Sequence, residues 1–452
     1  DVLQDGILYL PNKFTDNSME ITKVGQDSFI CTRDISKSIK KVVVLKGITE
    51  LGQSSFADTR IEKISLPSTL TDLGISSMQG TSLTSINIPS NVKQIANNVF
   101  NNSRLKYVKL SGNVEQIGEH SFYNCTSLIY INFPTTLKTI GQNAFYNCGN
   151  LKQNIKLSSN MTAIGLGAFS ECYNILNVDL SETKLTNIPQ DAFNSNTNLQ
   201  RVKFPNTITN IGYRAFLMCK NLNADLSKCN DNIRIEALAF QYCEKLNTNL
   251  PSKCSYIGAQ AFAHTAITNI IITNTVKEIC AGAFSNSALQ SVIFASGTGS
   301  ITFGMDVFHT CKNLSSVTFS SRVTTLPQSM FYACDSLISI EIPASVTTLG
   351  IKVFRKCANL KNVTFATGTT ITTFSSQLFS TCTSLTSVTV PASVTKIDAK
   401  AFEECSALTG VTFADPTKTW TANGTSLSVA TPATNATNLV TTYVAYAWTK
   451  NS

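Results

Sequence analysis

Apolar residues recur along this chain with a period of 22 to 25 residues, and a phenylalanine marks each period. A fixed period of this size indicates one supersecondary unit that is stacked on copies of itself. The expected fold is therefore a solenoid, whose function is expected on an extended face rather than in a pocket. The marker positions are Phe56, Met78, Phe100, Phe122, Phe145, Phe169, Phe193, Phe216, Phe240, Phe262, Phe284, Phe308, Phe331, Phe354, Phe379 and Phe402.

The coil from Ile117 to Leu137 shows how one period is built. Ile131-Asn132-Phe133 alternates with period two, which predicts a short strand. The segment from Phe122 to Cys125 spaces its apolar residues three and four apart, which favours one helical or 3₁₀ turn. Gly118 stands where other coils have Pro or Asp, residues that share a preference for helix starts. Each coil is therefore expected to hold a strand, a turn, an extended stretch and one short helical turn.

These coils divide the chain into three parts. About 16 coils in residues 47–413 are expected to form the solenoid, because stacked neighbours cover the apolar side chains that one coil cannot bury. Residues 1–46 are expected to form a lead-in hairpin and cap, and residues 414–452 a C-terminal cap or tail. Three aromatic residues favour a cap over a linker for this last segment: Tyr443, Tyr446 and Trp448.

Composition adds the expectation of an extracellular or cell-surface location. Charged residues make up only 14% of the chain, against roughly 25% in soluble domains, so Ser, Thr and Asn must cover much of the surface. The formal net charge of +8 is mild and no basic run is present, so nucleic acid is not an expected partner. No apolar stretch approaches the roughly 18 residues of a membrane span. Because the chain begins at Asp1 rather than Met, a removed signal or lipid anchor stays open.

Two sequence blocks carry a family resemblance. The patterns L-x-x-[VI]-x-[FIL]-P and I-G-x-x-A-F-x-x-C recur over about four fifths of the chain. They resemble the BspA-like, or Treponema-type, leucine-rich repeat family, and the segments 5–9 and 19–24 are similar to its lead-in hairpin. The resemblance implies a leucine-rich repeat solenoid with a parallel strand per coil on one face. It also implies a bacterial surface or secreted protein, an adhesin in some members, and it transfers no catalytic residue.

Most of the 14 cysteines belong to the repeat. Ten of them stand three residues after the marker phenylalanine, at positions that otherwise hold Thr, Ser or Asn. Because the Cβ atoms of stacked equivalents stay about 5 Å apart, beyond the roughly 3.8 Å of a disulfide, a ladder of buried free thiols is expected. The ten are Cys125, Cys148, Cys172, Cys219, Cys243, Cys311, Cys334, Cys357, Cys382 and Cys405.

The remaining cysteines and the histidines suggest no catalytic or metal site. A disulfide between Cys229 and Cys254 stays open, whereas Cys31 and Cys280 are expected to be unpaired. No CxxC or Cys/His spacing is present, so neither a metal nor another cofactor is expected. The three histidines have no carboxylate or nucleophile in register and are expected to be surface residues: His120, His264 and His309.

The residues that flank the inward strand residue are expected to point outward, and they differ from coil to coil. Aromatic and Arg side chains are favoured at binding hot spots. The candidate binding face consists of Tyr107, Lys109, Tyr130, Asn132, Arg201, Lys203, Ile271 and Ile293. Other outward pairs include Asn223/Asp225 and Asn247/Asn249, and the last third is almost entirely Ser and Thr. The alternative is that such hydroxyl and amide columns only stabilise the stacked strands.

One acidic arrangement allows an enzymatic interpretation. Asp179 and Asp225 bracket Arg201 and Lys203 in adjacent coils, and they could be taken for an acid/base pair. The alternation of sign argues instead for a cross-strand ladder of ion pairs. No nucleophile elbow, phosphate loop or metal motif supports catalysis.

The leading hypothesis is therefore a non-enzymatic, monomeric surface or secreted protein that binds a macromolecule, protein or glycan, through its strand face. A spacer solenoid without a ligand of its own is the first alternative. A carbohydrate-active enzyme is the second.

Overall fold

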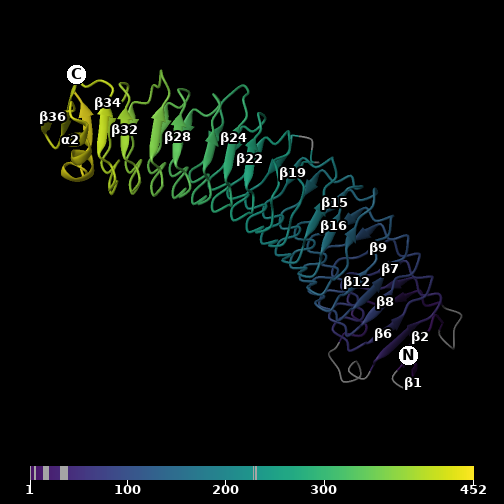
Figure 1. Cartoon of the computed structure of the whole chain (residues 1–452). Coiled ribbons are helices and arrows are strands. Elements are labelled where there is room, and N and C mark those ends of the chain that lie inside the picture. Colours follow the sequence, from purple (N-terminus) through teal and green to yellow (C-terminus); the bar gives the residue numbers. More distant parts are fainter. Residues whose placement is uncertain are drawn as a thin grey trace. The chain divides into compact units, whose positions relative to one another are not determined.

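The computed structural model describes residues 2–4, 7–13, 20–30, 39–227, 229 and 232–451. The chain forms two compact units, Asp1–Cys229 and Asn230–Ser452, and each is a stack of coils (Figure 1). Each regular coil contributes one front strand, at the [VI]-x-[FIL] block, and one back strand of two residues. The sequence-predicted solenoid of parallel strands is confirmed.

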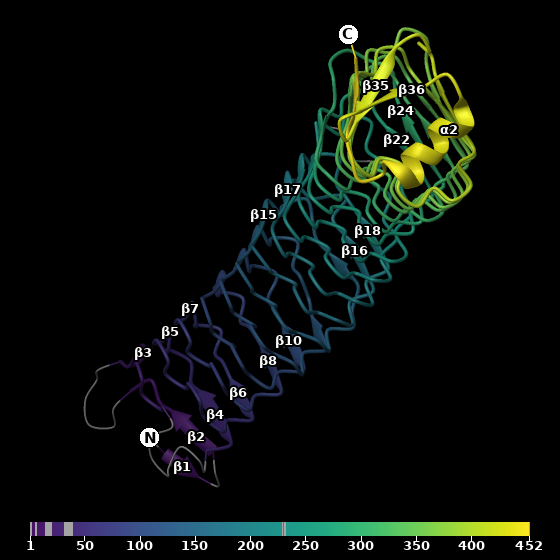
Figure 2. The same cartoon turned by 90° about the vertical axis from the view of Figure 1, so that its left-hand side faces the viewer.

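In the first unit the two kinds of strand form separate columns of parallel pairs, apart from the antiparallel β1–β2 hairpin (Figure 2). The front column holds β1(Val2–Gln4), β2(Ile7–Leu10), β4(Lys41–Val44), β6(Lys63–Ser65), β8(Ser85–Asn87), β10(Tyr107–Lys109), β12(Tyr130–Ile131), β14(Ile155–Lys156), β16(Asn177–Asp179) and β18(Arg201–Lys203). The back column holds β3(Lys23–Val24), β5(Glu50–Leu51), β7(Asp72–Leu73), β9(Gln94–Ile95), β11(Gln116–Ile117), β13(Thr139–Ile140), β15(Ala163–Ile164), β17(Asn187–Ile188) and β19(Asn210–Ile211).

The second unit repeats this arrangement. Its front column holds β22(Asn269–Ile272), β24(Ser291–Phe294), β26(Ser316–Thr318), β28(Ser339–Ile342), β30(Asn362–Phe365), β32(Ser387–Val390) and β34(Gly410–Phe413). Its back column holds β20(Arg234–Ile235), β21(Tyr256–Ile257), β23(Glu278–Ile279), β25(Thr302–Phe303), β27(Thr325–Leu326), β29(Thr348–Leu349), β31(Thr373–Phe374) and β33(Lys396–Ile397). Only two residues of each coil pair in the back column, at the extended stretch that the sequence analysis expected.

The marker phenylalanines form the centre of the core. They are fully buried, and successive rings stack with centroids 5.1–5.7 Å apart within each unit. The column starts one coil earlier than expected, since Phe29 stacks on Phe56 at 5.1 Å with an interplanar angle of 3°. The estimate of about 16 coils is therefore one short. The 27-residue gap between these two phenylalanines hid the first coil from the 22–25-residue period.

The segment around each phenylalanine is a series of β-turns, and the predicted helical turn is absent from the described coils. The residues two before and two after the phenylalanine have positive φ, as in His120 (53°) and Asn124 (57°) around Phe122. A helix requires negative φ throughout, so these two residues exclude it. Their N–H groups, with that of Phe122, donate to carbonyls of the next coil at 2.8–2.9 Å. The turns thus form a third hydrogen-bonded column.

The cysteines of the repeat are buried free thiols, as predicted, and they also donate hydrogen bonds. In nine of the ten, Cys243 aside, the Sγ lies 3.0–3.4 Å from the carbonyl oxygen of the phenylalanine in the preceding coil; Cys357 to Phe331, for example, is 3.0 Å. A buried carbonyl that would otherwise lack a second partner is therefore satisfied by a small side chain. Cys229 and Cys254 are also free and buried, whereas Cys31 lies outside the described residues.

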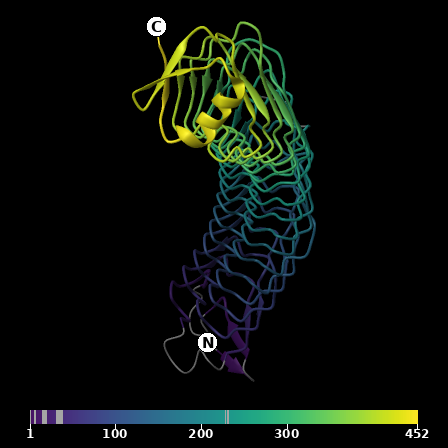
Figure 3. The ribbon, with the colours of Figure 1, turned by 60° about the vertical axis from the view of Figure 1, so that its left-hand side comes forward.

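The C-terminal segment covers the last coil on both columns. Its elements are the hairpin β35(Thr419–Ala422) and β36(Thr425–Ser428), α2(Pro432–Thr437), a π-helical turn (Asn438–Thr442) and β37(Trp448–Lys450). Strand β37 pairs antiparallel with β33, and α2 packs against β34. Figure 3 shows the helix at the C-terminal end of the stack, drawn in yellow. The fully buried Asn435 donates its amide to the Val411 carbonyl oxygen at 2.8 Å. These contacts support our proposal that residues 414–452 act as a cap.

We expect Phe145→Ala to lower the free energy of unfolding by about 3–5 kcal/mol, because the ring is fully buried and stacks on both neighbouring phenylalanines. Urea unfolding followed by circular dichroism measures this loss. Tyr130→Ala is the control, since its side chain is half exposed and a change within about 0.5 kcal/mol is expected. Equal losses in the two variants would contradict a core that depends on the phenylalanine column.

We expect the ladder thiols to resist alkylation in the folded protein. Burial raises the pKa of Cys125, Cys357 and Cys405 to about 12, so almost no thiolate is present at pH 8. In a Cys31→Ser background, a maleimide or disulfide reagent should modify Cys280 alone, which is the one half-exposed thiol among the described residues. All 13 remaining thiols should react in guanidinium chloride. Rapid native labelling of several thiols would disprove the buried ladder.

Candidate interaction surface

Two tyrosines on the front strands of the first unit are the most exposed aromatic residues that the structure describes. Tyr107 on β10 and Tyr130 on β12 are paired in register and have exposed fractions of 53% and 50%. Val108 and Ile131, which follow them, are buried. The alternation of inward and outward side chains therefore agrees with the sequence prediction, and it leaves two aromatic rings side by side in solvent.

Basic side chains accompany these tyrosines on the same face. Lys63, Lys109 and Arg201 are exposed, and within the described residues no carboxylate lies within ion-pair distance of any of them. Arg201 stands on β18, three coils after Tyr130, so it lies roughly 14 Å farther along the column at the usual strand spacing. The tyrosine pair and the Arg201 coil therefore form two neighbouring parts of one face rather than a single cluster.

The acidic residues next to Arg201 are ion-paired or hydrogen-bonded. Lys203 Nζ lies 3.1 Å from Asp179 Oδ2, which confirms this pair of the predicted cross-strand ladder. Partial burial opposes the charge of Asp179, but hydrogen bonds from Ser181 and the ammonium of Lys203 outweigh it and lower the pKa of this carboxyl group. Asp225 accepts the Ser227 N–H at 2.9 Å. An ionised, paired Asp179 cannot act as a general acid at neutral pH.

Asn132 differs from the other candidates because its side-chain amide is hydrogen-bonded to the backbone of the preceding coil. Its Oδ1 accepts the Leu110 N–H at 2.7 Å, and its Nδ2 donates to the Leu110 carbonyl oxygen at 3.0 Å. Gln153 makes the same two bonds to Ile131 in the next coil, at 3.0 and 2.6 Å. The sequence analysis missed Gln153, although the one extra residue between Leu151 and Ile155 marks it.

Two coils lack the front strand that the sequence analysis expected. Residues 222–226 and 246–250 are not in strands, so the pairs Asn223/Asp225 and Asn247/Asn249 do not continue a strand face. The inward position holds Ala224 in the first of these coils and Thr248 in the second, where the other coils hold Val or Ile. Alanine is depleted in strands, which agrees with the missing strand of the first coil. Threonine is itself β-branched and common in strands, so residue type does not account for the second interruption.

The front face of the second unit is different in character. Ile271 on β22 and Ile293 on β24 are paired in register with exposed fractions of 50% and 42%, as predicted for outward residues. Beside them Ser291 Oγ donates to Asn269 Oδ1 at 2.6 Å. Thr389 and Thr412 continue the outward column on β32 and β34. This face therefore contains one apolar pair followed by polar side chains, some of which bond to each other.

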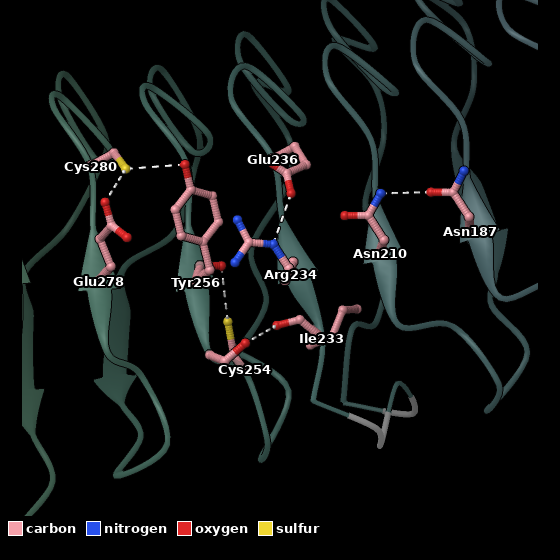
Figure 4. Close-up of polar contacts among 10 residues, drawn as sticks. Asn187, Asn210, Ile233, Arg234, Glu236, Cys254, Tyr256, Glu278 and Cys280 are labelled. Carbon is pink, nitrogen blue, oxygen red and sulfur yellow. Dashed lines mark hydrogen bonds and ion pairs between the residues drawn. The ribbon is translucent and has the colours of Figure 1, made fainter.

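The half-exposed Cys280 belongs to a polar cluster on the back strands of the second unit (Figure 4). Its Sγ lies 3.3 Å from Tyr256 Oη and 3.5 Å from Glu278 Oε1, and the Arg234 guanidinium lies 3.9 Å from the centre of the Tyr256 ring. Burial, together with the Glu278 charge, raises the pKa of Cys280 despite the hydrogen bond with Tyr256. The thiol is therefore not activated as a nucleophile.

The three histidines are half-buried and lie against tyrosines, two of them stacked and His120 tilted by 57°. His264 stacks on Tyr242 at 4.3 Å between ring centres, His309 on Tyr332 at 4.5 Å, and His120 lies 5.4 Å from Tyr123. Burial lowers the pKa of His264 and His309. No group of three or more His, Cys, Asp or Glu residues suited to a metal ion occurs in the described ranges.

The repeat geometry agrees with the comparison to known families. The model of the BspA type leucine rich repeat region, with six copies, matches residues 22–152, 116–247, 233–334 and 297–409. The chain belongs to the BspA-type leucine-rich repeat family. No curated protein matches it. The family is one of repeat proteins, and no catalytic family is indicated.

Solved structures with similarity to this chain include three bacterial proteins. A leucine-rich repeat protein from Bacteroides ovatus is 22% identical over 90% of this chain and 86% of its own, with a TM-score of 0.54, which shows the shared fold. A leucine rich cell surface protein from Faecalibacterium prausnitzii is 20% identical over 91% and 88%, with a TM-score of 0.35. The pneumococcal vaccine antigen PcpA is 16% identical over 87% and 84%, with a TM-score of 0.29. In the part of this chain that the structure describes, no helix is long and apolar enough to cross a bilayer.

We expect Gln153→Ala to lower the free energy of unfolding by about 1–3 kcal/mol, because it leaves the N–H and the carbonyl oxygen of Ile131 without the amide partner. Thermal or urea unfolding measures the loss. Lys152→Ala removes the exposed neighbouring side chain and should change stability by less than about 0.5 kcal/mol. If both variants are as stable as the wild type, the amide bridge does not hold these coils together.

Proposed function

We propose that this BspA-type protein is a non-enzymatic scaffold, secreted or displayed at a cell surface, that binds a macromolecular partner through the front face of its first unit. The observation that carries the proposal is the in-register pair Tyr107 and Tyr130, half exposed on paired strands. Tyr side chains supply large contact areas at low entropic cost, and they are enriched at binding hot spots.

The charges around the tyrosines support the same face. Lys63, Lys109 and Arg201 have no carboxylate partner within the described residues, so a partner with acidic groups would gain their attraction. A protein partner fits this mixture of aromatic and basic groups, and repeat solenoids present extended surfaces of this kind. We take adhesion to host matrix or to other cells as the biological setting, and a glycan partner as the alternative to a protein.

A spacer role is the second candidate, and one observation favours it for the second unit. There the outward side chains of Ser291 and Asn269 bond to each other across the strands, and the column continues through Thr389 and Thr412. Side-chain pairs of this type stabilise adjacent strands without a ligand. In that role the second unit would have no ligand of its own.

We expect the Tyr107→Ala/Tyr130→Ala/Arg201→Ala variant to lose binding to purified extracellular matrix proteins at 0.15 M salt, because it removes both aromatic anchors and one unpaired charge. Surface plasmon resonance against fibronectin, laminin and collagen, with a glycan array in parallel, measures the change, and a loss of at least tenfold is expected. Thr389→Ala/Thr412→Ala/Ser387→Ala in the second unit is the matched control. If the triple variant binds as tightly as the wild type does, this face is not the binding site.

A further inference from the structure

The coils differ in the number of residues between the marker residue and the next inward Leu or Ile. In most coils the next inward Leu or Ile stands six positions after the marker residue, as Leu128 does after Phe122, and in five coils it stands only five positions after it. The five short coils run from Phe56 to Ile61, Met78 to Leu83, Phe100 to Leu105, Phe262 to Ile267 and Phe284 to Leu289. All five have Thr or Ser, never Cys, three residues after the marker.

The side chain at that position has different partners in long and short coils. In a long coil the Cys thiol reaches the carbonyl oxygen of the preceding phenylalanine. In a short coil the Thr hydroxyl bonds within its own coil: Thr59 donates to the Phe56 carbonyl oxygen at 2.8 Å, and Thr265 to that of Phe262 at 2.8 Å. In the two short coils with Ser, the hydroxyl oxygen lies 3.3 and 3.4 Å from the cysteine Sγ of the next coil instead. In all five short coils the chain between the turn and the front strand is one residue shorter.

Consecutive short coils produce grooves on this side of the solenoid. The two short coils of the second unit coincide with a groove of about 630 Å³ around Ala266 and Ala288. The three short coils of the first unit coincide with a groove of about 610 Å³. This second groove reaches Lys63 on β6, so it opens at the edge of the proposed binding face.

The groove of the first unit has an excess of positive charge. Four cations and two carboxylates line it: Lys40, Arg60, Lys63, Arg104, Asp58 and Glu62. The Lys40 ammonium pairs with Glu62, while Arg60, Lys63 and Arg104 have no carboxylate within ion-pair distance in the described part of the chain. The Asp58 carboxylate lies against Gly80, where an added Cβ would meet its Oδ1 at 2.1 Å. Three cations of the groove therefore have no ion-pair partner, and Asp58 is the one lining carboxylate that is not paired with Lys40.

We propose that this short-coil groove binds a carboxylate-bearing, extended segment of a protein partner, with Arg60 and Arg104 each taking one acidic side chain. The proposal rests on the proposed function in taking the partner to be a protein. The two arginines stand two coils apart, about 10 Å at the strand spacing. Acidic residues at i and i+3 of a polyproline-II segment lie on one side and about 9 Å apart, which matches this separation. Guanidinium groups bind carboxylates by two parallel hydrogen bonds.

The two carboxylates of the groove favour a peptide over a uniformly charged polysaccharide. A sulfated chain with charge on every unit would place anionic groups against Asp58 and Glu62 as well as against the arginines. A polypeptide can instead place neutral residues there and acidic residues only opposite the cations. The hydroxyl groups of Ser82 and Thr84 also line the groove and can bond to the free backbone groups of an extended peptide.

Fluorescence anisotropy with the full chain and a fluorescein-labelled (Glu-Pro-Pro)4 peptide tests the proposal at 0.05 and 0.15 M salt. The (Gln-Pro-Pro)4 peptide should bind at least tenfold more weakly, and Arg60→Gln/Arg104→Gln should weaken the Glu peptide by at least tenfold. Lys277→Gln/Lys361→Gln, two exposed lysines of the second unit, removes the same charge and should change the affinity by less than twofold. Both arginines are exposed, and equal melting temperatures verify that the variants fold.

The outcomes separate this inference from the proposed function. If the arginine variant binds the Glu peptide as well as the wild type does, or if neither peptide binds, the groove is not an acidic-peptide site. If heparin binds more tightly than the peptide and depends on the same arginines, the site takes a polysaccharide and the inference is overturned. Loss of matrix binding in Tyr107→Ala/Tyr130→Ala with unchanged peptide binding supports both proposals. If the tyrosine changes leave both peptide binding and matrix binding unaffected, the proposed binding face is excluded. The proposal of an acidic-peptide site in the groove then still holds.

Discussion

Backbone hydrogen bonds between adjacent coils are the constraint on which this protein depends. A front strand of two to four residues and a back strand of two cannot pair within their own coil, so their N–H and carbonyl groups pair with those of the coils before and after. The turn around each phenylalanine follows the same rule, as Phe122 N–H donates to the Ala144 carbonyl oxygen at 2.8 Å. Three such columns fix the spacing of the coils, and the phenylalanine rings stack at the distance that this spacing sets.

This constraint divides the residues of a coil into two groups. Side chains that point inward must fit identical neighbours, so the core repeats Phe, Leu, Ile and a thiol with little freedom. The cysteine fits this position for two reasons: its side chain is small, and its S–H group donates to the buried carbonyl oxygen of the preceding coil. Outward side chains meet only solvent or each other, and they can vary from coil to coil at little cost in stability.

The strained turns show how strongly the columns hold the backbone. A positive φ suits Asn, Asp and Gly, yet the same positions hold Leu238, Tyr242, Lys352 and Lys356. A left-handed conformation costs such residues roughly 1–2 kcal/mol each. The inter-coil bonds made by the N–H groups of these residues, such as Tyr242 to the Ala263 carbonyl oxygen at 3.0 Å, offset that cost. Coil length still varies between coils, and two of the grooves coincide with consecutive short coils.

The sequence by itself determined the register of this protein. The recurring phenylalanine, the alternating strand block and the parallel Cβ geometry of the cysteines predicted the stacked coils, the exposed Tyr107 and Tyr130, and the free thiols, because each depends on local periodicity alone. Contacts between coils were decided only by the tertiary structure. The left-handed turn positions have no fixed residue type, and the amide bridges of Asn132 and Gln153 are visible only when the neighbouring coil is in place. The buried Arg322, which donates to the carbonyl oxygens of Thr273, Val276 and Gly299, depends on residues up to 49 positions away, where no local pattern can reach.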